Sequence, residues 1–160
     1  MKRVDRILKH AVFRACIEKN RECEKDRIFC RHDVEHFLSV ARIAYILNLK
    51  KKVRQKRELI YGAALLHDIG RYRQYEEGIP HEKASAALAP AILKDCGFDE
   101  KETEQIVDAI KNHRNAGIRK EKSLRGILYQ ADKLSRGCYI CPAESACNWK
   151  NNKKNMRLRY

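Results

Sequence analysis

The chain has 160 residues, of which 44% are hydrophobic and 35% charged, and this balance fits one globular domain with a core of its own. No apolar run is long enough to cross a bilayer and no secretory leader is recognisable, so we expect a cytoplasmic protein without membrane contact. The formal net charge of +14 favours an anionic partner, but the basic residues are dispersed and lack interleaved aromatic residues, so nucleic acid is not favoured.

Helical periodicity runs through most of the sequence, interrupted by three prolines and seven glycines, and no alternating strand pattern of useful length occurs. We therefore predict an all-α fold, a compact bundle of about six helices. Asp99 and Glu102 have the spacing of a reciprocal N-terminal cap, which marks the start of the fifth helix. The predicted helices cover, in order, residues 2–20, 33–48, 56–68, 81–95, 99–114 and 121–136.

Some segments fall outside the predicted helices. The stretch at 20–32 is a polar connection, and RYRQYEEGIP at 71–80 is predicted to be a loop that ends at a proline able to open the next helix. The last segment is less regular. We expect a single domain over 1–160, with an N-terminal helix and connection at 1–29, a core at about 30–136 and a cysteine-containing tail at 137–160.

Several ionisable residues lie on or beside the apolar faces of the predicted helices. A single histidine on such a face is usually a hydrogen-bonded core residue, but charges buried together are normally paired or coordinate a metal. Imidazole and carboxylate ligands suit iron, manganese, zinc or nickel, so we predict a metal site between the helices. The residues in question are His32, His36, His67, Asp68, His81, His113 and Asp132.

Three segments resemble, in order, the motifs of the HD-domain superfamily of metal-dependent phosphohydrolases. HDVEHFLSVARIA at 32–44 is similar to the first helix motif of that family, AALLHDIGR at 63–71 to its signature, and ADKLS at 131–135 to its last ligand segment. The resemblance covers about residues 30–136 and implies an all-α core with a bound metal. The ligands that it implies for a first metal are His36, His67, Asp68 and Asp132.

The resemblance also bears on the number of ions. His81 and His113 match positions at which some branches of the family bind a second metal, with Asp68 bridging the two ions. The alternative is that these two histidines contact only substrate phosphate. We expect one or two divalent ions, iron, manganese, zinc or nickel, and favour two; the GYP motif of cyclic-dinucleotide phosphodiesterases is absent.

The implied activity is hydrolysis of a small phosphorylated molecule, which we take to be a nucleotide, by a metal-activated water. Asp68 is then the central catalytic residue, Arg71 and Lys133 are candidates for binding phosphate, and Tyr72 for stacking on a base. His32 is a candidate orienting residue or general acid. The alternatives are surface positions for Arg71 and Lys133, a helix start for His32 and a core position for Tyr72.

Two other functional classes stay open. A di-iron oxygenase is one, because a few relatives in the family use the same ligands for oxygen chemistry. A non-catalytic basic module that binds phosphate or nucleic acid is the other, and it would need no metal. The sequence does not indicate the oligomeric state.

The tail contains a second possible metal site. CYICPAESACNW at 138–149 has the spacing C-x2-C-x5-C, and two cysteines separated by two residues can share a zinc ion. Cys138, Cys141 and Cys147 lack a fourth partner nearby in sequence, unless Cys30 approaches from the other end of the core. The alternative is that they are free thiols.

Overall fold

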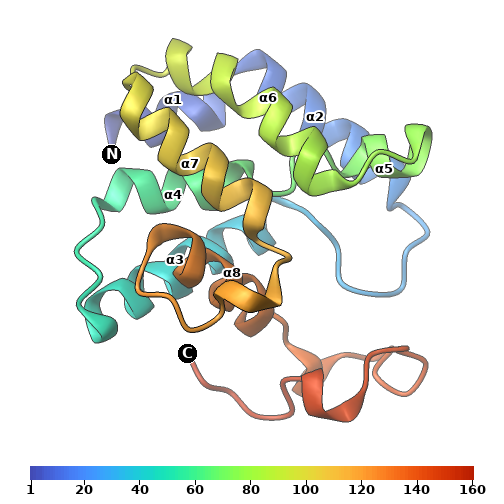
Figure 1. Ribbon diagram of the computed structural model, residues 1–160. Helices are drawn as coiled ribbons and strands as arrows, with labels where there is room; N and C mark the ends of the chain where they lie inside the picture. Colours follow the sequence, from blue (N-terminus) through green and yellow to red (C-terminus); the bar gives the residue numbers. More distant parts are fainter.

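The computed structural model describes residues 1–160 as an all-α protein without strands, which confirms the predicted fold class (Figure 1). Eight α helices form the bundle, and three short 3₁₀ turns connect or follow them. The helices are α1 (Lys2–Lys9), α2 (Ala11–Cys23), α3 (Val34–Lys51), α4 (Arg57–Leu66), α5 (Arg71–Glu77), α6 (His81–Asp95), α7 (Glu100–Asn112) and α8 (Leu124–Leu134). The 3₁₀ turns are η1 (Ala116–Ile118), η2 (Cys138–Ile140) and η3 (Asn151–Lys153).

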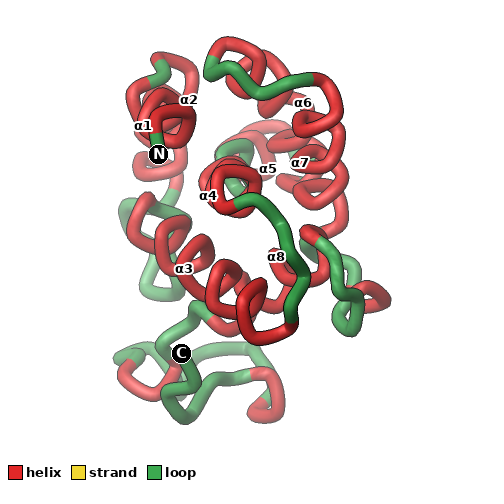
Figure 2. Tube along the Cα trace, turned by 90° about the vertical axis from the view of Figure 1, so that its left-hand side faces the viewer, coloured by secondary structure: helices red, strands yellow, loops and turns green.

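Helix α4 lies at the centre of the bundle, where α1, α3, α7 and α8 surround it (Figure 2). Its sequence, RELIYGAALL, is apolar on nearly every side, as expected for a helix that other helices enclose. The small residues on α4 let its neighbours come close: a Cβ on Gly62 would lie only 3.2 Å from the Ile106 side chain of α7. The C-terminal end of α4 is therefore held in the interior of the protein.

The N-terminal region differs from the single helix predicted at 2–20. His10 has an extended backbone (φ −67°, ψ 131°) that separates α1 from α2. Its ring Nδ1 accepts a hydrogen bond from the backbone N–H of Val12 at 3.2 Å, so His10 caps α2. The apolar periodicity continues across this break and conceals it, because Val4 and Ile7 on α1 and Phe13 on α2 all face the core.

The prediction of a loop at 71–80 is wrong for most of this segment, because residues 71–77 form α5. Arg73 and Glu77 lie one helical turn apart, and their side chains make two hydrogen bonds of 2.8 and 2.7 Å, which stabilise this short helix. Only Tyr72 of α5 is buried, so the segment lacks the apolar stripe that predicts a helix. Gly78 ends α5 with a positive φ of 70°.

The cap predicted at Asp99 is confirmed. The Asp99 carboxylate accepts a hydrogen bond from the Glu102 backbone N–H at 2.8 Å, and the Glu102 carboxylate accepts one from the Asp99 backbone N–H at 3.4 Å. Glu102 also pairs with Arg3, which reaches Glu58 as well. The guanidinium of Arg3 thus joins α1, α4 and α7, and its hydrogen bond is the main cause that lowers the pKa of Glu102 to about 2.

The tail after α8 has little regular structure and lies below α3 and α8 in Figure 1. In residues 137–160 only Ala143 is buried. None of the helices combines the length and apolar character that a bilayer crossing requires.

Substitution Gly70→Ala tests the close packing that positions the end of α4. A Cβ at Gly70 would lie 2.5 Å from the Ser85 backbone nitrogen and 2.7 Å from the Ala84 side chain on α6, so the helices must separate. We expect urea denaturation to show a free energy of unfolding lower by about 1–3 kcal/mol. Gly137→Ala is the matched control, because its Cβ would meet nothing closer than 3.6 Å. Equal stability of the two variants would contradict the prediction.

Candidate metal centre

The dipeptide His67-Asp68 follows α4 directly and is buried, with 0% and 3% of the two residues exposed. Asn20 on α2 holds the backbone on both sides of the turn. Its side-chain amide donates to the Asp68 carbonyl at 3.0 Å, and its oxygen accepts from the Tyr72 N–H at 2.8 Å. Sequence reasoning missed Asn20, although it lies four residues after the buried Cys16 and therefore on the same helix face.

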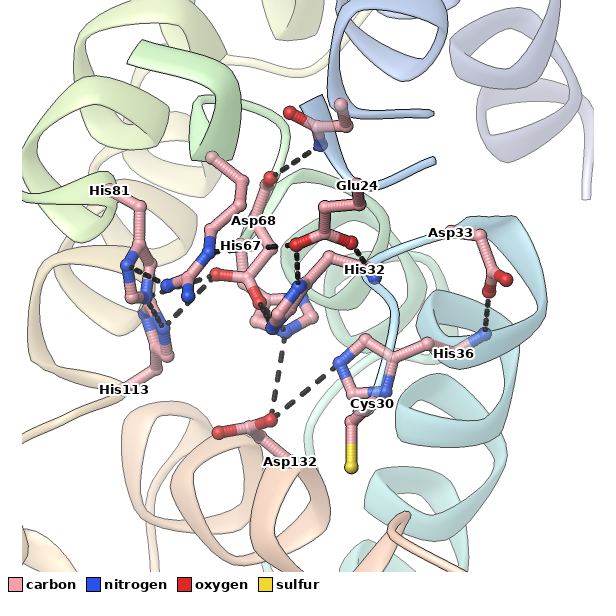
Figure 3. A network of polar contacts seen from close by, with 12 residues as sticks. Glu24, Cys30, His32, Asp33, His36, His67, Asp68, His81, His113 and Asp132 are labelled. Atoms are coloured by element: carbon pink, nitrogen blue, oxygen red, sulfur yellow. Dashed lines mark hydrogen bonds and ion pairs between the residues drawn. The ribbon is translucent and has the colours of Figure 1, made fainter. Parts of the chain in front are cut away.

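Three residues from separate parts of the bundle form a first cluster (Figure 3). His36 comes from α3, His67 from the end of α4 and Asp132 from α8. The Asp132 Oδ1 atom lies 3.6 Å from His36 Nε2 and 4.0 Å from His67 Nε2. Both imidazole nitrogens are buried without a hydrogen-bond partner, which is unusual for polar atoms in a protein interior.

A second cluster lies next to the first. His81 at the start of α6 and His113 at the end of α7 point their Nε2 atoms at each other across 3.2 Å. These nitrogens lie 3.3 and 3.4 Å from Oδ1 of Asp68. Two imidazole nitrogens and one carboxylate oxygen thus converge on a small volume, which is the arrangement of metal ligands.

Asp68 contacts both clusters. Its Oδ2 lies 3.3 Å from Nε2 of His67, whereas its Oδ1 faces His81 and His113. The structure therefore brings together the six residues that the resemblance to the family implied as ligands. The Asp68 carboxylate lies between the two clusters, with one oxygen facing each of them.

Hydrogen bonds on the far side of the imidazole rings favour the form that binds a metal. His67 Nδ1 donates to the Ala64 carbonyl and His113 Nδ1 donates to the Ile110 carbonyl, each at 2.7 Å. A ring that donates from Nδ1 keeps the lone pair of Nε2 free for a ligand bond. The residues present therefore fit a divalent ion at each cluster.

The protonation states of the histidines and of Asp68 bear on whether these side chains can bind a metal. Burial lowers the pKa of His36 to about 4 and that of His81 to about 3, so both rings are neutral near pH 7. Burial would raise the pKa of Asp68, but the imidazoles, that of His67 above all, outweigh it and hold the pKa well below its ordinary range. For His67 itself, burial would lower the pKa, but the carboxylates of Asp68 and Asp132 outweigh it and raise the pKa, so these carboxylates favour positive charge at this place.

A pocket of about 410 Å³ opens over the two clusters, and many of its lining side chains are positively charged. Arg71 donates from Nη1 to Nδ1 of His81 at 2.7 Å, and Lys133 donates to Oδ2 of Asp132 at 2.5 Å. The two predicted phosphate-binding residues therefore lie at the edge of the clusters. The cationic residues that line the pocket are Arg27, Arg71, Arg114, Lys133 and Arg136.

His32 also lines this pocket, held by the buried Glu24. One Glu24 oxygen accepts from His32 Nδ1 at 2.6 Å and from the Tyr75 hydroxyl at 2.8 Å, and the other accepts from the His32 backbone N–H at 2.8 Å. The Nε2 of His32 faces Asp68 Oδ2 at 3.8 Å. Burial would raise the pKa of Glu24, but its bonds to His32 outweigh this and lower it to about 2. Glu24 lies in a polar connection, where no sequence signal distinguishes it.

Tyr72, predicted to stack on substrate, belongs to the apolar core and does not line the pocket. Lys19 lies over its ring, and its hydroxyl contacts the Cys16 thiol. The aromatic residues that do line the pocket are Phe29 and Trp149. Sequence reasoning placed neither of them at the site, because both lie in irregular segments.

Comparison with known proteins identifies the class. Residues 33–137 match the model of the HD domain, and the chain belongs to that family. An uncharacterized protein of Clostridium beijerinckii is 41% identical over the full length of both chains. An uncharacterized protein of Methanocaldococcus jannaschii is 39% identical over 104 residues, which are 63% of this chain and 56% of that one.

A solved structure shows the same fold. The crystal structure of a predicted HD superfamily hydrolase from an uncultured Thermotogales bacterium superposes with a TM-score of 0.61 at 29% identity. The match covers 88% of this chain and 79% of that one. The resemblance inferred from the three motifs is thereby confirmed.

Counting bound manganese tests the two clusters, because Mn²⁺ prefers carboxylate over thiolate ligands. We expect two Mn²⁺ per chain in the wild type, one for each cluster, and the loss of one in His81→Ala. Elemental analysis after equilibrium dialysis measures the count. His10→Ala is the control, since His10 contacts Asp95 and lies outside both clusters. A wild type that binds a single ion, or a His81→Ala variant with an unchanged count, would rule out the two-ion centre.

Proposed function

We propose that this protein is a metal-dependent phosphohydrolase that acts on a small phosphorylated molecule, and that this molecule is a nucleotide. The observation that supports it best is the combination of the two clusters joined by Asp68 with a cation-lined pocket directly above them. The name of the Thermotogales neighbour, a predicted hydrolase of the same superfamily, agrees with this proposal.

The metal ligands in this proposal are the residues of the two clusters. His36, His67 and Asp132 would hold one ion and His81 and His113 the other, with Asp68 shared. Divalent ions there supply a Lewis acid, which lowers the pKa of water and neutralises charge on a phosphoryl group.

The cationic side chains bind and orient the substrate. Arg71 and Arg114 lie on the His81 side of the pocket, and Lys133 lies on the Asp132 side. A guanidinium offers paired N–H donors that match phosphate oxygens, whereas the Lys133 ammonium acts as a point charge. Asp68 lines the same pocket, so phosphate bound by these side chains would lie close to both clusters.

His32 is the residue placed to move a proton. Its Nδ1 is occupied by the Glu24 carboxylate, so its Nε2 is directed into the pocket toward Asp68. A histidine oriented by a buried carboxylate can donate a proton to a leaving oxygen or accept one from an attacking water. We assign His32 this role and Glu24 the role of positioning it.

The nucleotide part of the proposal depends on Phe29 and Trp149. Both rings line the pocket, and the Arg136 guanidinium lies 3.6 Å above the centre of the Trp149 ring. Aromatic rings stack on nucleobases at about 1–3 kcal/mol per base. A substrate that has a base as well as phosphate would use both the aromatic and the cationic parts of the lining.

Phosphate release from a panel of nucleotides and phosphorylated sugars, with Mn²⁺, Zn²⁺, Fe²⁺ or Ni²⁺ added, tests the activity. We expect metal-dependent release that Asp68→Asn lowers at least about 100-fold, because the substitution removes the charge shared by both clusters.

Asp108→Asn is the matched control, since this aspartate is exposed on α7 and pairs with Arg125. Activity retained in Asp68→Asn would refute the proposal. Oxygen consumption by the iron-loaded protein without phosphate release would support the di-iron oxygenase instead.

Glu24→Gln tests the positioning of His32. The amide keeps the size of the side chain but removes the charge that accepts from Nδ1, so we expect kcat to fall roughly 10- to 100-fold while KM stays unchanged. Bound Mn²⁺ should also be unchanged, because Glu24 belongs to neither cluster. Glu22→Gln, two residues earlier and exposed, should behave as wild type. Loss of manganese in Glu24→Gln, or a kcat equal to that of Glu22→Gln, would disprove the assigned role.

A further inference from the structure

Three free cysteines line the pocket outside the two clusters, and a fourth, Cys141, is near enough to affect the Cys30 thiol. Cys30, Cys138 and Cys147 line the pocket together, although Cys30 lies more than one hundred residues before the other two. Cys141 follows Cys138 in a tight turn, in which its N–H donates to the Cys138 carbonyl at 3.3 Å. Figure 3 shows the Cys30 sulfur pointing away from the imidazole clusters. The fold thus supplies the fourth cysteine that the tail lacks.

The thiols are close enough to affect one another. Desolvation raises the pKa of the Cys30 thiol, Arg136 opposes this, and the neighbouring thiols of Cys138 and Cys141 raise it further. Cys147 is connected to the same group through two further tight turns, from Cys141 to Glu144 and from Glu144 to Cys147.

Two cations, Arg136 and Lys154, face this group of thiols, and the Arg136 guanidinium also stacks on the Trp149 ring. The Arg136 Nη1 atom is buried without any hydrogen bond. The Lys154 side chain is only 7% exposed; its Nζ donates to Glu144 at 2.6 Å, and the thiols of Cys147 and Cys138 further raise its pKa. Lys154 already has the Glu144 carboxylate, whereas thiolates bound to a metal would give the buried Arg136 Nη1 atom a negatively charged partner.

The tail has little packing of its own, and hydrogen bonds from the Asn155 amide to the Lys133 and Arg136 carbonyls join it to the end of α8. It buries only Ala143 and contains no element longer than a 3₁₀ turn. Segments without an apolar core of their own are commonly held by a metal or by disulfides.

We propose that Cys30, Cys138, Cys141 and Cys147 bind one structural Zn²⁺ ion that fastens the tail to the connection before α3. No three of the sulfur atoms lie within 4.8 Å of one another, so the ion would draw the two irregular segments together. This connection contains His32, and the tail follows Asp132 on α8. The zinc site would therefore fix one wall of the pocket, whatever reaction takes place there.

Cobalt and zinc binding test the proposal. The experiment uses the full-length chain with His67→Ala and Asp68→Asn, which disable the imidazole and carboxylate centre. We expect this protein to bind one Co²⁺ with a sulfur-to-cobalt charge-transfer band, and one Zn²⁺ whose X-ray absorption shows Zn–S distances of about 2.3 Å.

Cysteine variants in the same background identify the ligands. Cys138→Ser should lose the charge-transfer band and the bound zinc, and Cys30→Ser should weaken zinc binding at least about tenfold. Cys23→Ser is the matched control, because Cys23 is partly exposed on α2 and does not line the pocket. It should retain both signals.

Several results would overturn the proposal. A cobalt spectrum without the sulfur band excludes thiolate ligation even if the serine variants fail to fold. Equal zinc content in Cys138→Ser and Cys23→Ser excludes Cys138 as a ligand. Thiol titration of the unreduced, denatured wild type with chelator should find all seven cysteines; a deficit would show that a disulfide takes the place of zinc.

Discussion

The buried carboxylate of Asp68 is the constraint on which this structure depends. It lies in the interior between two groups of imidazoles, and an uncompensated charge there would be very costly. The protein holds it with a central helix that is apolar on nearly all sides and with the Asn20 amide, which fixes the backbone of the turn. The contacts that stabilise the core therefore also fix the geometry of the site.

The candidate ligands come from five places along the chain, so no local segment can form the centre alone. His36 lies on α3, His67 and Asp68 follow α4, His81 begins α6, His113 follows α7 and Asp132 lies on α8. The site is assembled only when these helices pack. Conversely, a bound cation would connect the ends of these helices. Its positive charge would offset the cost of burying the carboxylates and imidazoles in the core. Metal binding at these clusters would therefore be coupled to folding.

Helical periodicity made the inward position of the candidate ligands predictable, because a histidine or aspartate at the register of an apolar stripe faces the interior. His36 and Asp132 could be placed in this way. Residues in irregular segments could not, since nothing in the sequence near Glu24 or Trp149 specifies how the chain folds back. Tyr72 shows the opposite difficulty: its segment looked like a loop, and the helix that forms there directs the ring into the core. The break at His10 was hidden because the apolar pattern runs through it.

The division between helices and irregular segments also separates the candidate metal ligands from the side chains that would select the substrate. The candidate ligands are fixed by the helical core, whereas Phe29, Arg136 and Trp149 lie in the connection before α3 or after the end of α8. Such irregular segments can change sequence without disturbing the core, so the HD fold can keep its centre and alter the molecule that reaches it. A loosely structured wall would orient a substrate poorly, because recognition requires that side chains be held in place. A cross-link between the two segments resolves this conflict: it leaves their sequences free to vary and still makes the wall rigid.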